Sequence, residues 1–212
     1  MQLHKFEFNP FYENTYILYD ETGEAIIIDP GCYEPYEQAE LTNFITKNQL
    51  KPVAVVNTHC HIDHVLGNAF CKRQFGIPLQ IPVGEQEVLD AVPTYSSNYG
   101  FQRYEQAEVD SHFENEGKLS FGQTELKILY APGHAPGHLM FLHEESKQLI
   151  AGDVIFRQSI GRTDLPGGDF DTLEHSIKTQ VYTLADEVTI FPGHGPSTTI
   201  GYEKQHNPFV KA

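Results

Sequence analysis

The chain has 212 residues, enough for one well-buried core, so we expect a single domain over residues 1–212. Its 14 basic and 29 acidic residues give a formal net charge of -15, which argues against a nucleic-acid or anionic-membrane partner. The sequence shows no signal peptide and no apolar run long enough to span a membrane, and its three cysteines cannot pair completely. We therefore expect a cytoplasmic protein with free thiols. The oligomeric state stays open.

The first part of the chain alternates strand and helix patterns. Four apolar, β-branched runs predict strands, at residues 6–8, 15–19, 25–29 and 52–56. The composition of Asp20–Gly23 is that of a hairpin turn. Helical spacing of apolar residues appears at 33–48, and a second helix at 65–75 is expected to end at Gly76.

The middle of the chain has a weaker pattern. Residues 79–81 predict a strand, and residues 84–89 predict a short acidic helix. Between residues 91 and 110 the periodicity fails, although the segment is rich in tyrosine. Loops of this length are commonly functional or mobile. Two interpretations stay open for 91–110: a lid over a site, or a segment that packs onto the rest of the domain.

Strand patterns start again in the second half. They cover residues 119–121, 126–131, 138–142, 148–151 and 188–191. Residues 171–184 predict a helix, with Asp171 as the N-cap and Glu174 as its capping-box partner. Two sets of strands, each accompanied by helices, predict an α+β fold of two sheets packed face to face with helices outside.

The hexapeptide His59-Cys60-His61-Ile62-Asp63-His64 is the strongest functional signal. Alternate side chains of an extended strand share one face, so His59 and His61 can converge on one metal ion while Cys60 points away. A helix that starts just afterwards turns Asp63 and His64 toward a second ion. The alternative is a solvated, histidine-rich loop. The spacing and the flanking strand and helix favour metal.

Three further candidate ligands follow predicted strands, each beside Gly or Pro-Gly: His134, Asp153 and His194. Strand-end loops of a sheet can cluster in space although they are distant in sequence. With the hexapeptide they make five histidines and two aspartates, a set that suits two ions sharing one carboxylate. Each of these turns, taken alone, is equally compatible with ordinary loop chemistry.

A second tier of residues has weaker support. We interpret Arg162 and Asp164 as an ion pair that fixes a loop, with contact between Arg162 and an anionic substrate as the alternative. Tyr12 and Phe156 are candidates for a substrate wall. The remaining histidines are interpreted as structural or exposed: His4, His112, His138, His143, His175 and His206.

The pattern of histidines and aspartates resembles the metallo-β-lactamase superfamily over nearly the whole chain. The resemblance implies an αββα sandwich of two mixed β-sheets flanked by helices. It also implies a first metal site of His59, His61 and His134, and a second of Asp63, His64 and His194 with Asp153 bridging. Within that superfamily, Gly161–Asp169 and Pro192–Thr199 resemble the short, single-domain glyoxalase II-like hydrolases.

The resemblance implies a dinuclear metal-dependent thioesterase of the hydroxyacylglutathione hydrolase type acting on a small-molecule thioester. Two divalent ions lower the pKa of a bridging water and polarise the carbonyl that the resulting hydroxide attacks; zinc is our first choice, and iron or manganese suit the same ligands. A thiolate leaving group, of pKa about 8.5, needs little acid assistance. Asp63 and Asp153 are the candidate proton carriers. Because only 18 residues follow His194, we expect no C-terminal glutathione-binding domain, and the thiol stays open.

The main alternative is a mononuclear iron persulfide dioxygenase, which holds its iron with two histidines and an aspartate. Cys60 and Gly161–Asp164 resemble that family, whereas His194 favours a second metal. A lactonase or β-lactamase ranks lower, and the acidic charge disfavours a nuclease. A non-enzymatic metal-binding module ranks low because structural metal sites are normally closed. Metal stoichiometry separates the two leading hypotheses.

Overall fold

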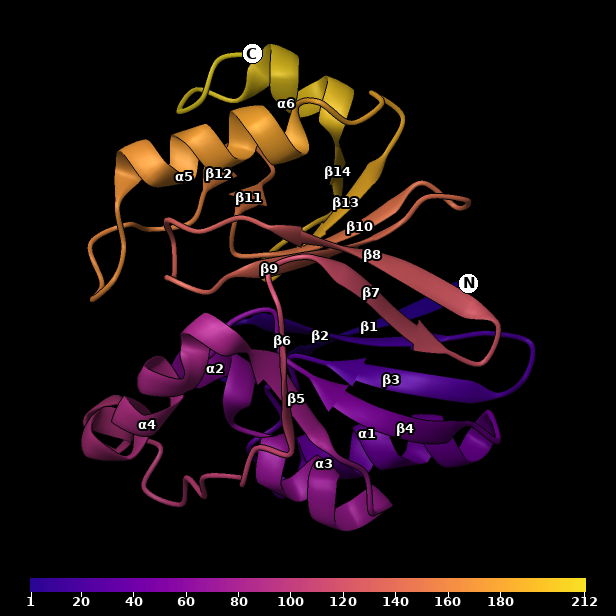
Figure 1. Cartoon of the computed structure of the whole chain (residues 1–212). Helices are drawn as coiled ribbons and strands as arrows, with labels where there is room; N and C mark the ends of the chain where they lie inside the picture. The colour runs from indigo at the N-terminus through magenta and orange to yellow at the C-terminus, as the bar shows by residue number, and fades with distance from the viewer.

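The computed structural model describes residues 1–212 and has four layers, helix, sheet, sheet and helix (Figure 1). The first sheet has six strands in chain order: β1 (Gln2–Phe8), β2 (Glu13–Tyr19), β3 (Glu24–Ile28), β4 (Lys51–Val56), β5 (Leu79–Pro82) and β6 (Ser111–Phe113). Strands β1 to β3 are antiparallel neighbours, and β3 to β6 run parallel. The sheet is therefore mixed.

The second sheet is also mixed and has the order β14-β13-β10-β9-β8-β7. Its strands are β7 (Gly117–Phe121), β8 (Thr124–Tyr130), β9 (Leu139–His143), β10 (Gln148–Gly152), β13 (Thr189–Pro192) and β14 (Thr198–Thr199). Only β10 and β13 pair in parallel. A small hairpin of β11 (Ile155–Phe156) and β12 (Ser159–Ile160) follows β10.

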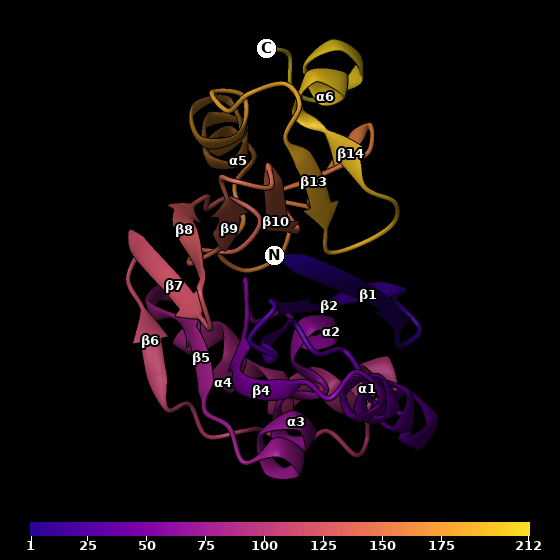
Figure 2. The same ribbon diagram turned by 90° about the vertical axis from the view of Figure 1, so that its right-hand side faces the viewer.

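The helices cover the two outer faces. Those of the first half lie beneath the first sheet: α1 (Pro35–Lys47), α2 (Ile62–Val65), α3 (Asn68–Phe75) and α4 (Gln86–Tyr95). Helices α5 (Phe170–Ser176) and α6 (Ile200–His206) cover the second sheet, as the rotated view also shows (Figure 2). The predicted αββα sandwich is confirmed. None of these helices is both long and apolar enough to cross a membrane.

Strand alternation builds three apolar layers. On β3, Ile26 and Ile28 face the second sheet, whereas Ile27 faces the core between the first sheet and its helices. The layer between the sheets consists of Tyr16, Leu18, Ile26, Ile28, Ala54, Val56, Leu119, Phe121, Leu126, Ile128, Leu139, Phe141 and Ile150. Full burial of each large apolar side chain contributes about 1.5–3 kcal/mol. This layer fixes one sheet against the other.

The predicted N-cap of the helix after residue 170 is wrong. The cap is Asp169, whose carboxylate accepts the Thr172 backbone N–H at 2.8 Å, and Asp171 already lies in the first turn. Both aspartates fit the capping pattern, and the extended backbone of Asp169 decides between them. The helix continues after Ser176 as a π-helical turn over Ile177–Val181, a spacing that the apolar pattern did not reveal.

Helix α4 is longer than predicted. It runs to Tyr95 although Pro93 lies inside it and lacks the N–H that would bond to residue 89. Leu89 and Val92 are buried in the core beneath the first sheet, and this packing outweighs the lost bond. A 3₁₀ turn over Ser96–Tyr99 follows, so the expected irregular segment covers only the residues after it. The region of the helix predicted at 65–75 contains two helices: α2 ends at Val65, and α3 starts at Asn68 and ends before Gly76 as expected.

Asp20 joins the turns of the two sheets. Its carboxylate accepts the Thr22 backbone N–H at 2.9 Å in its own turn, and the Gln123 N–H at 2.7 Å and Thr124 hydroxyl at 3.0 Å in the β7–β8 turn. Burial raises the pKa of Asp20, but these hydrogen bonds outweigh it and lower the pKa from 3.8 to about 2. Asp20 therefore stabilises the sandwich while it is ionised.

We expect Asp20→Asn to lower the free energy of unfolding by about 1–3 kcal/mol at pH 7, because an amide N–H₂ would face donors of the β7–β8 turn. The folded pKa lies below the unfolded one, so the stabilisation is complete above about pH 4 and is lost as the pH falls from about 4 to 2. Urea unfolding at several pH values measures this difference. Asp186→Asn, at an exposed ion pair with Lys204, is the matched control. Equal stability of Asp20→Asn and wild type at pH 7 would contradict the role of Asp20.

Candidate metal centre

The seven candidate ligands meet where strand-end loops of both sheets converge. His59 and His61 follow β4, Asp63 and His64 lie in α2, and the others follow strands of the second sheet: His134 after β8, Asp153 after β10 and His194 after β13. Six of them form two groups, each with ligand-type atoms within 4.8 Å of one another: His59, His61 and His134, and Asp63, His64 and His194. The structure thus brings together every residue that the sequence nominated as a ligand.

The first group presents three ring nitrogens to a common point. His134 Nε2 lies 2.9 Å from His61 Nδ1 and 3.3 Å from His59 Nε2. Two ligands about 2.0–2.1 Å from a tetrahedral ion lie roughly 3.3 Å apart, so the spacing suits a metal. Burial, followed by the neighbouring imidazole of His134, lowers the pKa of His61 to about 3. Burial also holds the pKa of His59 well below its usual value. Both rings are neutral, as metal ligands must be.

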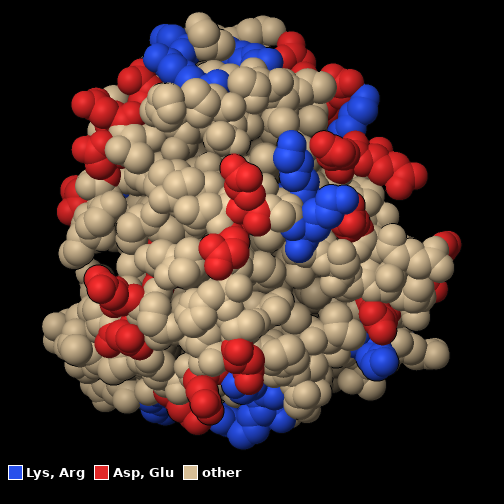
Figure 3. Space-filling view, in the orientation of Figure 1, with Lys and Arg blue, Asp and Glu red and all other residues tan.

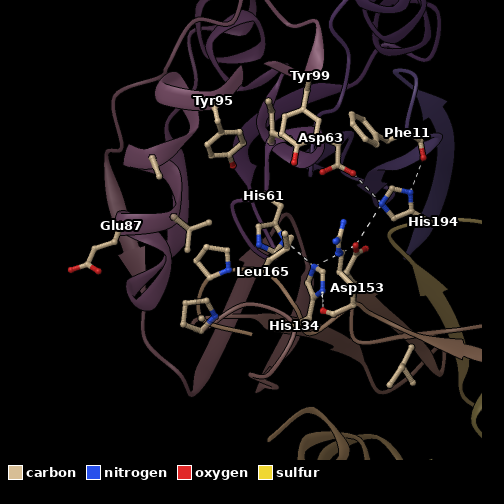
Figure 4. A pocket seen from close by; sticks show the side chains of 18 of the residues that line it. Phe11, His61, Asp63, Glu87, Tyr95, Tyr99, His134, Asp153, Leu165 and His194 are labelled. Carbon is tan, nitrogen blue, oxygen red and sulfur yellow. Dashed lines mark hydrogen bonds and ion pairs between the residues drawn. The ribbon is translucent and has the colours of Figure 1, made fainter. Parts of the chain in front are cut away.

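Asp153 links the first group to the second. One carboxylate oxygen, Oδ2, lies 3.5 Å from His134 Nε2 and 3.5 Å from His194 Nε2 (Figure 4). The other, Oδ1, lies 3.5 Å from His64 Nε2. His194 Nε2 lies 3.1 Å from Asp63 Oδ2. A carboxylate between two groups of ligands is the arrangement that a bridging ligand requires.

Two buried atoms at the centre have no hydrogen-bond partner, His64 Nε2 and Asp153 Oδ1. An unpaired buried polar atom costs about 1–3 kcal/mol, so native proteins rarely retain one without a function. Both atoms face the same point, 3.5 Å apart. A cation coordinated by both would satisfy them, and the donor set of imidazoles and carboxylates therefore fits divalent metal.

The charges of the second group complement one another. Burial raises the pKa of Asp153, but His64 and His194 outweigh it and hold this pKa well below its usual range. Burial lowers the pKa of His64, but Asp153 and Asp63 outweigh that effect and raise it well above the ordinary value. The carboxylates thus stabilise positive charge at this point, which is what a divalent ion supplies.

Outer hydrogen bonds fix how the rings are presented. His134 Nδ1 donates to the Arg162 carbonyl at 2.8 Å, and His194 Nδ1 donates to the Phe11 carbonyl at 3.0 Å. A carbonyl only accepts, so in each ring Nδ1 carries a proton and a neutral ring offers the Nε2 lone pair to the centre. Such outer partners orient metal ligands and increase their basicity.

Asp29 orients the ligands of the hexapeptide in a similar way. Its carboxylate accepts the Thr58 backbone N–H at 2.7 Å, the Thr58 hydroxyl at 2.6 Å and His64 Nδ1 at 3.2 Å. Since Thr58 donates to Asp29, its oxygen accepts from His59 Nδ1 at 3.0 Å. Asp29 was not predicted as a site residue, although it ends a predicted strand and precedes Pro30-Gly31, a signal similar to the one that identified the later ligands.

His138 is a second residue that the sequence analysis did not place in the site. It was interpreted as structural or exposed, and it is fully buried. Its ring stacks on His59 with centroids 4.7 Å apart, and its Nε2 accepts the Asp153 backbone N–H at 3.0 Å. The chain repeats Ala-Pro-Gly-His at residues 131–134 and 135–138, and this repeat is the signal that could have found it.

Glu85 ties the hexapeptide to the His134 loop. Its buried carboxylate accepts the Cys60 N–H at 2.8 Å and the Gly137 N–H at 2.6 Å. Burial, which outweighs these bonds, raises the pKa of Glu85 to about 7. Gly84 and Gly137 touch so closely that a Cβ on Gly84 would lie 2.8 Å from the Gly137 Cα. Cys60 faces this support and not the centre, in agreement with strand alternation.

A cleft of about 1060 Å³ opens onto the centre. Tyr95 and Tyr99 line it from the first half, and Phe156 and Arg162 line it from the second (Figure 4). The expected wall residue Tyr12 does not line the cleft: its side chain is 68% exposed, and Phe11 lines the wall in its place. Segment 91–110 packs onto the domain, because Phe101 is buried in the first-sheet core, and Tyr95 and Tyr99 line the cleft. A lid over the site stays a prediction.

Sequence comparison agrees with this geometry. The profile of the metallo-beta-lactamase superfamily matches residues 8–194. The chain belongs to the metallo-β-lactamase superfamily. This membership confirms the family resemblance seen in the sequence, and together with the histidine and aspartate clusters it identifies a metal-dependent hydrolase.

Individual relatives cover the chain almost completely. Hydroxyacylglutathione hydrolase GloC of Haemophilus influenzae is 36% identical over 204 residues, which are 95% of this chain and 94% of that protein. The BLEG-1 B3 metallo-beta-lactamase superposes with a TM-score of 0.91 at 34% identity, covering 100% of both chains. TTHA1623, solved in a di-iron-bound form, superposes with a TM-score of 0.87 at 32% identity, covering 98% of this chain and 100% of its own.

We expect Asp29→Asn to reduce affinity for divalent metal by about 10- to 100-fold, because the amide N–H₂ would face a donor and disturb His59 and His64 together. Competition with a chromophoric chelator measures the affinity. Asp186→Asn again controls for the chemistry of the substitution at an exposed position. Wild-type affinity in a folded Asp29→Asn protein would contradict the outer-shell role of Asp29.

Proposed function

We propose that the protein is a dinuclear metal-dependent thioesterase, chemically of the hydroxyacylglutathione hydrolase type. The observation that carries this proposal is the second group of ligands, complete with His194 and joined to the first by Asp153. The 36% identity to GloC supports the thioester as the bond attacked. Two ions are proposed at His59, His61 and His134 and at Asp63, His64 and His194, with Asp153 shared. Zinc is our first choice. Because TTHA1623 was solved in a di-iron-bound form, iron is also tested.

Ions bound there supply a Lewis acid for the substrate carbonyl and an activated water at neutral pH. The chain's own residues orient the substrate and manage protons. Asp63 lines the cleft, and its pKa is lowered because the effect of His64 and His194 outweighs burial, so it is ionised at neutral pH. Asp63 and Asp153 are therefore proposed to accept the proton released when water attacks. The departing thiolate needs little acid assistance.

One second function has an observation in its favour. The structure superposes on the BLEG-1 metallo-beta-lactamase over the full length of both chains. Hydrolysis of a β-lactam at the same centre is therefore our second candidate function. The mononuclear iron dioxygenase hypothesis gives no role to His194, which lies 3.1 Å from Asp63 in the structure. We rank it below both hydrolase functions. The cytoplasmic location stays a prediction.

We expect native protein to bind two metal ions per chain and His194→Ala to bind one, because the substitution removes a ligand of the second group and leaves His59, His61 and His134 in place. Elemental analysis after exhaustive dialysis measures the ratio. His175→Ala, at an exposed histidine, is the matched control and should keep two. One iron per wild-type chain, with oxygen uptake on a persulfide, would favour the dioxygenase instead.

The reaction is tested with a panel of a small acyl thioester, a lactone and a β-lactam, assayed with zinc-, iron- and manganese-loaded protein. We expect the thioester to have the highest kcat/KM. We expect Asp153→Asn to lower it by at least about 100-fold, since one carboxylate serves both groups. A β-lactam turned over faster than every thioester would reassign the substrate. Thioester hydrolysis no faster than in the metal-free control would end the proposal.

A further inference from the structure

The walls of the cleft are apolar close to the metal centre. Tyr95, Tyr99 and Leu165 line the cleft (Figure 4), and so do Phe156 and Ile160. Burial raises the pKa of Tyr95 to about 12, so its hydroxyl is neutral at physiological pH. Aromatic and aliphatic walls bind the apolar part of a ligand, and a few polar groups orient it.

Charge in the cleft is sparse once the candidate ligands are set aside. The remaining charged lining residues are Glu87 and Arg162. Glu87 is an anion and lies at the end of the cleft away from His194 (Figure 4). Arg162 is therefore the single side chain of the lining that could pair with a carboxylate or phosphate on a substrate.

Arg162 is already paired with an acidic side chain. Its Nε and one terminal nitrogen each donate to Asp164 at 2.7 Å, one to each carboxylate oxygen. This two-point fork is the geometry with which arginine would otherwise bind a carboxylate or phosphate of a substrate. The favoured interpretation of Arg162 and Asp164 as a structural pair agrees with this contact. An anionic substrate must compete with Asp164 for the guanidinium.

The overall charge of the chain adds to this effect. The chain has a net charge of -15, and on the face in Figure 3 acidic side chains are spread widely while basic ones form small separate groups. A field of that sign slows the approach of anions. Glutathione carries two carboxylates and one ammonium group, and coenzyme A carries several phosphate charges, so a field of that sign opposes the approach of thioesters of both thiols.

We propose, on the basis of the proposed thioesterase function, that the cleft selects thioesters with an apolar acyl group and an uncharged thiol portion over thioesters of glutathione or coenzyme A. The walls contact the acyl and thiol portions on either side of the scissile bond. The Arg162–Asp164 pair engages the one cationic side chain that lines the cleft, so an anionic thiol must compete with Asp164 for it.

The test compares one acyl group, hexanoyl, on three thiols: N-acetylcysteamine, glutathione and coenzyme A, with metal-loaded wild-type protein. We expect kcat/KM for the neutral N-acetylcysteamine thioester to exceed kcat/KM for the glutathione and coenzyme A thioesters by at least about tenfold. We also expect kcat/KM for the N-acetylcysteamine thioester to fall when an acetyl group replaces the hexanoyl group. Higher salt should narrow the gap between thiols because it screens the repulsion.

Two variants examine the cause. Asp164→Asn frees the Arg162 guanidinium, and Leu165→Lys places a new cation on the apolar wall. Each should raise the ratio of kcat/KM for hexanoyl-glutathione to that for the neutral thioester by several-fold. Asp186→Asn, which removes a distant negative charge of the same size, should leave that ratio at the wild-type value. Metal content of each variant is measured alongside.

The outcomes separate the two proposals. If no thioester is hydrolysed by the metal-loaded protein, the thioesterase function fails. If the glutathione or coenzyme A thioester is preferred, the function stands and the selectivity proposed here is overturned. If the ratio changes in neither cation variant, the charge argument is overturned even when the neutral thioester is preferred.

Discussion

The contact between the two sheets is the constraint on which the metal centre depends. Neither half of the chain holds a complete set of ligands: His59, His61, Asp63 and His64 belong to the first half, and His134, Asp153 and His194 to the second. The apolar layer between the sheets sets the distance between their strand ends. A slip of one residue in any of these strands would turn its side chains to the other face and move the ligand loops.

Polar contacts fix more closely the positions of the ligand loops, which the apolar layer sets approximately. The Asn14 amide donates to the carbonyls of Pro192 and Gly195 at 2.9 and 2.8 Å, and the Tyr16 hydroxyl donates to Pro192 at 2.6 Å. These contacts hold the loop of His194 against β2 of the other sheet. Leu139 N–H donates to the Thr58 carbonyl at 2.9 Å and holds the hexapeptide to β9. Buried polar contacts of this kind have strict geometry and therefore give the ligands a defined arrangement.

The electrostatic logic of the centre follows from burial. Removal from water disfavours charge on every histidine and aspartate, and only close opposite charges restore it at Asp63, His64 and Asp153. Burial, followed by the neighbouring imidazoles, lowers the pKa of His59 and of His61 in the first group. A cation is the species that satisfies both groups at once, since it coordinates neutral nitrogens and balances carboxylates.

The sequence by itself determined the longer strands, the sandwich and the nomination of all seven candidate ligands, because strand alternation and glycine-rich strand ends are local properties. The short strands β6, β11, β12 and β14 were not predicted. The sequence did not determine Asp29, His138 or Glu85, whose functions depend on partners 29, 15 and 52 residues away. It also misplaced the N-cap at Asp171 and ended α4 too early, where a choice between two carboxylates and the burial of Val92 were decided by packing. Only the tertiary structure showed that Arg162 lines the cleft while it pairs with Asp164, and that Tyr12 is outside the cleft, because the direction of a side chain depends on the neighbours that folding brings to it.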